Sequence, residues 1–398
     1  MTTQTPLAGR FDVLPLESVL FGPGVSGSLA VECAKRSVRR LFVVASPSLA
    51  RQIDVRERFA AATGGRVAAV FTGGRPHVPH DVVLAATRAA REAGADGVLS
   101  VGGGSAIDLA KAVVLCLAEG IDSAAALLRW KVVVSPSGTK QSPVTTAPKV
   151  PHFTVSTTLS AGEFTHIIGI TDTTRGAKDL YLSPDFVPRV VALDPGLAAH
   201  TPRSLWASTG IKAVDHAVET LCSPRAQPVT DALAADALRR LTRHLPASVR
   251  DAGDLHAAGQ CQLGAWQSIF GVTNVSLGLS HGIAHQLGGR LGVAHGVASC
   301  VLLPTVLEHH AEHTRGPQRL IADILAETTG HPAGLGAPEL LRRFIAGLRL
   351  PTGLREAGVG REEFPAIARH TVGDLMAAAA PGPALGTDDV EKILGRAW

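Results

Sequence analysis

The sequence contains few aromatic residues and no long apolar run. Phe, Trp and Tyr together make up 4% of its 398 residues, with one Tyr, and there are two Met. Because no uninterrupted stretch of about 18 apolar residues occurs, we expect no transmembrane helix and no membrane partner. The first residues lack a basic segment followed by an apolar one, so we expect no secretory signal and a cytoplasmic protein.

Cysteine and net charge are also low. The five cysteines are scattered and odd in number, which favours free thiols in a reducing compartment over a disulfide framework. The formal net charge is +4, and this mild excess suits an anionic substrate or a phosphate-bearing cofactor. No basic cluster alternates with aromatic residues, so we predict no nucleic-acid partner.

What the chain does contain is a change of pattern near residue 196. Before it, short β-branched runs alternate with Ala-rich helical stretches; the runs are 39–46, 67–72, 97–101, 153–157, 167–171 and 190–193. This alternation predicts a parallel sheet covered on both faces, with its last three strands partly antiparallel. After it only helical periodicity remains, including 281–287 and a helix over 388–398 capped by Thr387. We predict an α/β domain over residues 1–196 and an all-helical domain over 197–398.

Between these elements lies a segment rich in Pro, Ser and Thr, residues 135–151. It has no periodicity and predicts a surface loop or insertion, long enough to lean over a site.

Three glycines follow the predicted strand 97–101. Gly102, Gly103, Gly104 and Ser105 open a helix that continues through Asp108. Glycines allow a phosphate to approach the backbone, and a helix N-terminus offers unpaired N–H groups to an anion. The alternative is a tight turn without a ligand. The motif is not the G-x-G-x-x-G of an ordinary Rossmann turn, and it follows a later strand than the first.

A second polar cluster follows the strand 153–157. Thr157, Thr158 and Ser160 bring hydroxyl groups to a strand end, which suits hydrogen bonds to a phosphate or a carboxamide. Alone this signal is weak, because Ser and Thr are common in turns.

Histidines gather in two parts of the helical half. His281 and His285 are four residues apart and so share one helix face, and His295 follows a Gly-Gly pair that we expect to break that helix. Lys212 and His216 have the same spacing further upstream. Three imidazoles from 281 to 295 predict a site on their spacing alone, and the obvious candidate is a metal site.

The ordered set of motifs resembles the iron-containing (group III) alcohol dehydrogenase superfamily over nearly the whole chain. The matching pieces are FGPG (21–24), GGGSAIDLAKA (102–112), STTLSAGEFT (156–165), ITD followed by Lys178, LDP (193–195), GIKAVDHAVE (210–219), HGIAHQLGG (281–289), HGVASCVLLP (295–304) and DDVEKIL (388–394). The resemblance implies a dinucleotide-binding α/β domain, a helical domain, an active site in the cleft between them, and a homodimer.

The resemblance also implies a ligand set from which this chain departs. Metal-dependent members hold Fe²⁺ or Zn²⁺ with an Asp and three His, and the three His positions match His216, His281 and His295. The Asp position holds Lys212. An ammonium donates hydrogen bonds and accepts none, so it cannot replace an anionic ligand. We therefore expect no metal, as in the maleylacetate reductase branch, which the chain resembles most.

Our hypothesis is that the Lys212 ammonium takes the place of the metal. Its donors would reach the nitrogens of His216, His281 and His295 or the substrate oxygen, where a fixed cation stabilises developing negative charge. We expect a lowered Lys212 pKa, and a proton relay through His285, whose position lies near the nicotinamide in the family. The alternative is that Lys212 pairs with Asp215 or Glu219 and the histidines form a hydrogen-bonded core.

For the cofactor the resemblance implies NADH or NADPH. Its pyrophosphate would lie on 102–105, with Ser46, Asp108, Thr157, Thr158, Ser160 and Lys178 as further contacts. NAD-preferring members often carry an Asp where Ser46 stands, so NADPH is tolerated here.

We therefore predict a metal-independent NAD(P)H-dependent reductase that transfers hydride to a carbonyl or an activated C=C bond of a small, acidic substrate. One alternative is a Zn²⁺ or Fe²⁺ alcohol dehydrogenase that uses three His ligands. The other is a family scaffold with non-redox chemistry, such as a lyase or cyclase.

Overall fold

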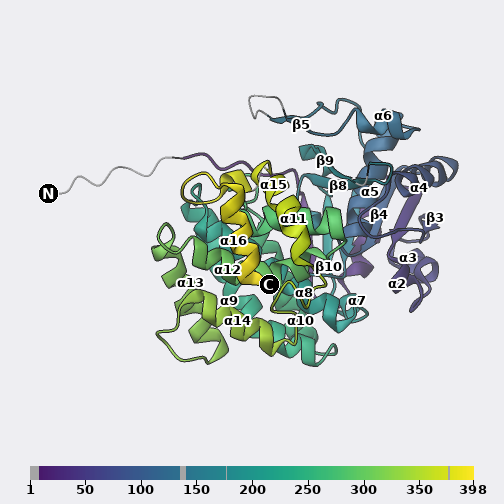
Figure 1. The fold of residues 1–398 in the computed structure, drawn as a ribbon. Helices are drawn as coiled ribbons and strands as arrows, with labels where there is room; N and C mark the ends of the chain where they lie inside the picture. The colour runs from purple at the N-terminus through teal and green to yellow at the C-terminus, as the bar shows by residue number, and fades with distance from the viewer. Residues whose placement is uncertain (1–8, 135–139, 176, 375–376) are drawn as a thin grey trace.

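The protein folds into an α/β half followed by a helical half. The computed structural model describes residues 9–134, 140–175, 177–374 and 377–398. Figure 1 shows the sheet and its helices in purple to teal and the helical half in green to yellow. The predicted fold class, an α/β half plus an all-helical half, is confirmed.

Six parallel strands form the sheet of the α/β half, in the order β1-β10-β7-β4-β2-β3. They are β1 (Ser18–Phe21), β2 (Leu41–Ala45), β3 (Val67–Phe71), β4 (Gly97–Gly102), β7 (His152–Ser156) and β10 (Val190–Leu193). Every residue of β2, β4, β7 and β10 is buried, which explains their continuous apolar sequences. β1 is an edge strand that the sequence pattern did not predict.

Seven short and medium helices belong to this half in the described residues. They are α1 (Leu29–Lys35), α2 (Pro47–Ala50), α3 (Val55–Ala62), α4 (His80–Glu92), α5 (Gly104–Ala118), α6 (Ala124–Leu128) and α7 (Pro195–Ala198). α5 matters most for the site, because it starts at the carboxyl end of the central strand β4 and packs against the sheet with apolar residues such as Ile107 and Val113.

Two antiparallel hairpins lie outside the sheet. β8 (Ile167–Asp172) pairs with β9 (Ala177–Leu182), and β5 (Val133–Val134) pairs with β6 (Lys140–Gln141). The prediction that the last three strands are partly antiparallel is therefore wrong for β7 and β10, which pair in parallel. The 167–171 run is antiparallel, but with β9.

The insertion predicted at residues 135–151 lies partly outside the described residues. Its described part lies beside β9 and does not line the cleft described below. Ser142 Oγ donates to Leu182 O at 2.7 Å, and just before the segment Val132 N donates to Leu180 O at 2.7 Å. These bonds attach the insertion to the edge of the β8–β9 hairpin.

The helical half is built around α8. Its helices are α8 (Arg203–Cys222), α9 (Pro228–Arg250), α10 (Leu255–Ile269), α11 (Leu279–Leu291), α12 (His295–His309), α13 (Arg315–Thr329), α14 (Ala337–Gly347), α15 (Phe364–Val372) and α16 (Thr387–Ala397). From Trp206 to Cys222 every residue of α8 except Lys212 is buried. A helix that is buried all round lies at the centre of its domain.

Two helix ends differ from the prediction. α11 does not break at Gly288 and Gly289 but ends before Gly292, which adopts φ 70° in the left-handed region that terminates helices. The last helix begins at Thr387, and Asp389, not Thr387, supplies the side-chain bond at that end by accepting from Gly386 N at 3.1 Å.

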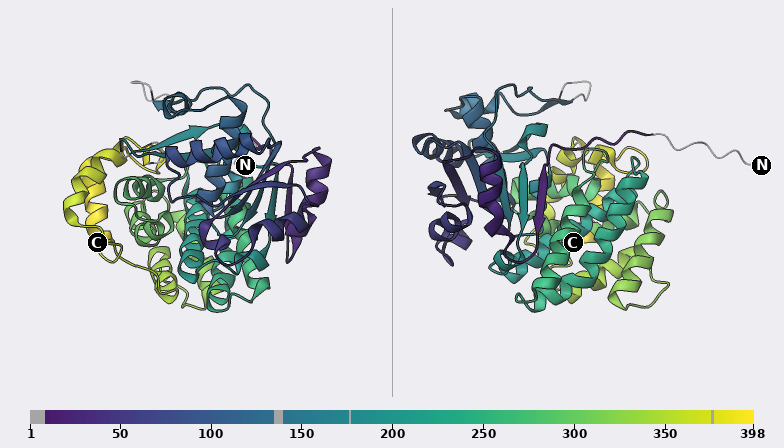
Figure 2. Two further views of the ribbon diagram at one scale, coloured as in Figure 1. Left: turned by 90° about the vertical axis from the view of Figure 1, so that its right-hand side faces the viewer. Right: turned by 180° about the vertical axis from the view of Figure 1, so that it is seen from behind.

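The two halves are joined by more than the connection at α7. Figure 2 shows from behind that the N-terminal segment runs from the sheet across the helical half. Asp12 N donates to Asn274 Oδ1 at 2.6 Å, and the rings of Phe11 and Phe270 stack 6.1 Å apart. No helix in the described ranges combines the length and the apolarity that crossing a bilayer requires.

Candidate active site

The turn between β4 and α5 brings the predicted cofactor residues together. Ser46 N donates to Val101 O at 2.9 Å, and Thr157 N donates to Gly102 O at 3.0 Å. A Cβ on Gly103 would lie 2.7 Å from Thr158 Cγ2, and one on Gly104 would lie 3.4 Å from Ser160 Oγ. The carboxyl ends of β2, β4 and β7 thus meet at one edge of the sheet, where α/β proteins bind nucleotides.

This turn fits the pyrophosphate of a dinucleotide. Gly102 adopts φ 150°, and a Cβ there would lie 2.9 Å from Ser46 Cβ, so only glycine is accommodated. Gly103 caps α5 without a side-chain hydrogen bond, which leaves the first N–H groups of the helix to an anion. Ser105 is exposed, while Asp108 accepts from Gly169 N at 3.3 Å and ties α5 to β8.

A cleft of about 790 Å³ lies beside this turn, with walls from both halves. The predicted site residues that line it are Gly104, Asp108, Ser160, Lys178, Lys212, His216, His281, His285 and His295. The other predicted cofactor residues lie in or near the turn but not in the cleft wall; they are Ser46, Gly102, Gly103, Ser105, Thr157 and Thr158. The cleft therefore runs from the head of α5 to the histidines.

The segment that floors the cleft near Gly162 is held by a buried lysine. Lys111 Nζ donates to Gly162 O and to Thr165 O, each at 2.7 Å, and to Ile167 O at 3.2 Å. Its side chain is fully buried, and burial lowers its pKa to about 8. Because Gly162 and Thr165 line the cleft, this ammonium fixes part of the backbone that forms the cleft wall.

The four histidines form a chain of neighbouring rings from three helices. The ring centroids of His216 and His281 lie 4.9 Å apart, those of His281 and His295 lie 4.9 Å apart, and those of His285 and His295 lie 5.7 Å apart. Three buried ring nitrogens have no hydrogen-bond partner among the described residues: His216 Nδ1, His281 Nε2 and His295 Nε2. Unpaired buried polar atoms are rare and mark a place for a ligand, a water or an ion.

Burial keeps the imidazoles of His216, His281 and His295 neutral. It lowers the pKa of His281 to about 4 and the pKa values of His216 and His295 well below the usual value, with the Lys212 charge acting in the same direction. A neutral imidazole offers one N–H donor and one bare nitrogen. The cluster can therefore donate to and accept from a group placed in the cleft.

Lys212 reaches this cleft from α8. Its Nζ donates to Ser160 O at 3.1 Å, and no hydrogen bond from it to an imidazole is found among the described residues. Burial lowers the Lys212 pKa to about 8, partly opposed by the charge of Asp108. The expected imidazole acceptors are thus replaced by a backbone carbonyl, and two of the three ammonium donors stay available to the cleft.

A metal held as in metal-dependent members does not fit these residues. Lys212 brings a cation to the position of the anionic ligand. Only one group of three or more His, Cys, Asp or Glu side chains in the described ranges has ligand atoms within 4.8 Å of one another, and it is Asp215, Glu219 and His281, not the three histidines.

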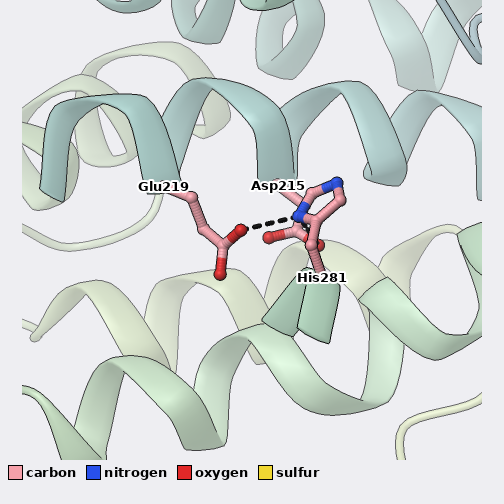
Figure 3. Close-up of side chains that lie close together, drawn as sticks. All are labelled: Asp215, Glu219 and His281. Carbon is pink, nitrogen blue, oxygen red and sulfur yellow. Dashed lines mark hydrogen bonds and ion pairs between the residues drawn. The ribbon is translucent and has the colours of Figure 1, made fainter. Parts of the chain in front are cut away.

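The Asp215–Glu219–His281 group is a buried hydrogen-bonded cluster behind the cleft (Figure 3). His281 Nδ1 lies 2.6 Å from Glu219 Oε2 and 3.7 Å from Asp215 Oδ2. Glu219 also accepts from Gly278 N and Ser280 N, each at 2.8 Å, and Asp215 accepts from Ser280 Oγ at 2.8 Å. The carboxylates thus cap the start of α11 and leave His281 Nε2 toward the cleft, as carboxylates behind functional histidines do.

The contacts of Asp215 and Glu219 show whether Lys212 pairs with a nearby carboxylate. Asp215 and Glu219 bind His281 and the start of α11, and neither forms an ion pair with Lys212 in the described structure. The sequence alone indicated Asp215 and Glu219 only as possible pairing partners for Lys212. Their i, i+4 spacing places Asp215 and Glu219 on one face of a helix. This spacing does not indicate that Glu219 binds His281, which lies 62 residues away.

Replacing Asp215 by Asn is expected to stabilise the protein relative to wild type as the pH rises. Burial raises the Asp215 pKa from 3.8 to about 7, so the folded protein keeps a proton that the unfolded chain has released. This stabilising contribution is complete below the unfolded pKa and is lost as the pH rises through the folded pKa. The difference in unfolding free energy, variant minus wild type, should rise by roughly 1–3 kcal/mol between about pH 5 and pH 8.

Urea unfolding of both proteins across this range measures the difference. The His281 pKa is lowered by burial in both proteins, so its titration largely cancels between them. A difference that does not change with pH would show that Asp215 titrates normally.

Comparison with known proteins places the whole chain in one family. The "Iron-containing alcohol dehydrogenase" family pattern matches residues 17–195, and the "Fe-containing alcohol dehydrogenase family, C-terminal" pattern matches residues 206–398. Lactaldehyde reductase of Escherichia coli (strain K12) is 30% identical over 393 residues, which cover 96% of this chain and 98% of that protein. Maleylacetate reductase of Pseudomonas aeruginosa is 30% identical over 357 residues, which cover 90% of this chain and 88% of that protein.

Solved structures give the same result. A 1,3-propanediol oxidoreductase has a TM-score of 0.85 and 27% identity, covering 98% of this chain and 100% of that one. Maleylacetate reductase from Rhizobium sp. strain MTP-10005 has a TM-score of 0.79 and 27% identity, covering 98% and 97%. The chain therefore belongs to the iron-containing alcohol dehydrogenase family, whose members are NAD(P)-dependent oxidoreductases.

Proposed function

We propose that this protein is a metal-independent NAD(P)H-dependent reductase that transfers hydride to a carbonyl or an activated C=C bond of a small, acidic substrate. The observation that carries this proposal is the position of Lys212. Among the described residues of the central helix it is the one between Trp206 and Cys222 that is not buried, and it lines the cleft together with His216. By the resemblance, its position in the motif is the one at which metal-dependent relatives have an anionic ligand.

The residues of the cleft suit this reaction. A bound NAD(P)H would supply the hydride. The turn at Gly102–Gly104 would hold its pyrophosphate, and Thr158 and Ser160 offer hydroxyls beside that turn. A carbonyl that receives hydride develops negative charge on oxygen, and the two available N–H donors of Lys212 can stabilise it.

The substrate class follows from the rest of the cleft wall. Ile269, Val272 and Leu277 line it with apolar side chains, while Lys178 and Lys212 bring positive charge to the same cleft. Arg290 also lines the cleft, but it is paired with Glu363. A short carbon chain with an acidic group fits both features. The names of the relatives, lactaldehyde reductase and maleylacetate reductase, supply the first compounds to assay.

The test is a reductase assay with lactaldehyde and with maleylacetate, using NADH and NADPH side by side. The rate should be unchanged after dialysis against EDTA, because Lys212 supplies the positive charge. Elemental analysis should find far less than one equivalent of zinc or iron per chain. Loss of activity on dialysis, with recovery on adding Zn²⁺ or Fe²⁺, would instead support a metal enzyme with three His ligands. No change in NAD(P)H fluorescence on titration would support non-redox chemistry.

A further inference from the structure

We propose that Asp374 is a positioning residue that fixes the orientation and the tautomer of His285, so that His285 Nε2 faces the cleft as the atom that gives a proton to the reduced oxygen. The proton transfer by His285 rests on the reductase function proposed above. The role of Asp374 in orienting His285 does not depend on that function.

Asp374 is brought to the site by the segment that follows α15. α15 packs against α11 (Figure 1), and the chain beyond it lies directly on the same helix. A Cβ on Gly282 would lie 2.8 Å from Ala377 Cβ and 2.9 Å from Ala377 N, so this contact requires glycine. Gly282 and His285 are three residues apart and lie on one face of α11. The contact at Gly282 therefore holds Asp374 beside His285.

Two donors from α11 meet one oxygen of Asp374. His285 Nδ1 lies 3.1 Å from Asp374 Oδ2, and Gln286 Nε2 donates to the same oxygen at 3.2 Å. A carboxylate only accepts hydrogen bonds, so the Nδ1 atom of His285 must carry the proton. Both side chains line the cleft, and with Nδ1 engaged, Nε2 is the ring nitrogen left for a substrate.

His285 differs from the other histidines in its access to solvent. The side chain of His285 is 28% exposed, whereas that of His281 is 4% exposed. Both have Nδ1 bound to a carboxylate, but only His285 can exchange protons with water without opening the core. The buried His281 is suited to holding a neutral donor or acceptor in place.

The proton step then balances in a simple way. Hydride adds to the carbonyl carbon, and the oxygen takes up the electron pair of the C=O π bond. The cationic form of His285, protonated on both ring nitrogens, gives the Nε2 proton to that oxygen and keeps the Nδ1 proton on the bond to Asp374, which leaves the neutral Nδ1–H tautomer. Water then returns a proton to Nε2. Lys212 stabilises the oxyanion, and His285 delivers the proton.

The first test reads the tautomer directly. In protein labelled with ¹⁵N-histidine, long-range ¹⁵N–¹H spectra assign the His285 signal by its absence from His285→Gln. Wild type should show the Nδ1–H tautomer. Asp374→Ala should shift this signal toward the Nε2–H tautomer, and Asp374→Asn, which keeps an acceptor oxygen, should retain Nδ1–H. An unchanged Nδ1–H tautomer in Asp374→Ala would overturn the proposal.

The second test is kinetic. Asp374→Ala should lower kcat by roughly tenfold or more with little change in the KM for the cofactor, and Asp374→Asn should lose less. The double variant with His285→Gln should be no slower than His285→Gln alone, because Asp374 acts only through His285 and both changes remove the same proton transfer. Glu362→Gln, an exposed carboxylate near the start of α15, is the control and should match wild type. Additive losses would overturn the proposal, as would wild-type kcat in Asp374→Ala.

The two proposals fail in different ways. If wild type reduces no carbonyl or C=C substrate, the proposed function fails, and the tautomer measurement alone decides the role of Asp374. If wild type is active and the tautomer does not depend on Asp374, only the positioning role fails.

Discussion

Replacing Lys212 by Met is expected to lower kcat/KM for carbonyl reduction by about 100-fold. Met retains most of the length and volume of the lysine stem, so the packing of α8 against its neighbours should survive. What is lost is the ammonium that donates to Ser160 O and faces the cleft. The oxyanion would then form without the fixed cation that stabilises its negative charge.

The pH profile of wild type provides a matching measurement. Because burial lowers the Lys212 pKa from 10.5 to about 8, the active ammonium form is lost as the pH rises through about 8, and kcat should fall in the same range. Lys392→Met, on the exposed face of α16, is the control and should keep the wild-type rate. Full turnover in Lys212→Met, with turnover abolished in His281→Ala and His285→Ala, would rule out the ammonium.

A reverse substitution tests the metal directly. Lys212→Asp restores the acidic residue that metal-dependent members have at this position, next to three histidines. We expect this variant to retain about one equivalent of Zn²⁺ or Fe²⁺ after purification, whereas wild type should not. Equal metal content in the two proteins would contradict the role of Lys212 as the residue that excludes the metal.

Replacing Gly102 by Ala is expected to have the second largest effect, a loss of cofactor affinity of about tenfold or more together with lower stability. The added Cβ would lie 2.9 Å from Ser46 Cβ and 3.0 Å from Ala106 Cβ, and neither atom can rotate away because each is fixed to the backbone. In addition, φ 150° is strained for any residue with a Cβ. Relief requires the head of α5 to move away from β2, which disrupts the phosphate cradle.

Fluorescence titration with NADH and NADPH measures the affinity, and thermal unfolding measures the stability. Gly316→Ala is the matched control, since a Cβ there meets nothing within 4 Å and the site lies on α13, outside the cleft. Wild-type affinity in Gly102→Ala would show that the cofactor does not use this turn.

Much of the fold and part of the site could be predicted from the sequence, because their signals are local. The buried strands β2, β4, β7 and β10 are continuous apolar runs, and α5 begins where three glycines end a strand. The four histidines and Lys212 lie within short motifs whose helical spacing places them on shared faces. Such patterns depend only on residues that are close together in the sequence.

What could not be predicted depends on contacts between distant segments. His281 is bonded to Glu219, 62 residues away, and His285 to Asp374, 89 residues away. Nothing in the sequence around Asp374 distinguishes it from a surface acid. The parallel pairing of β10 with β7 and β1 was also missed, because the edge strand β1 is only four residues long and carries little pattern.

The sequence by itself determined the fold class and the glycine turn between β4 and α5, since both depend on residue type and short spacing. Its resemblance to the family implied that Lys212 stands where metal-dependent members have an Asp. Only the tertiary structure decided that the Lys212 ammonium bonds to the Ser160 carbonyl and that two carboxylates hold the imidazoles from behind. The reason is physical: burial and hydrogen-bond geometry set the charge and direction of a side chain, and both depend on which helices pack around it.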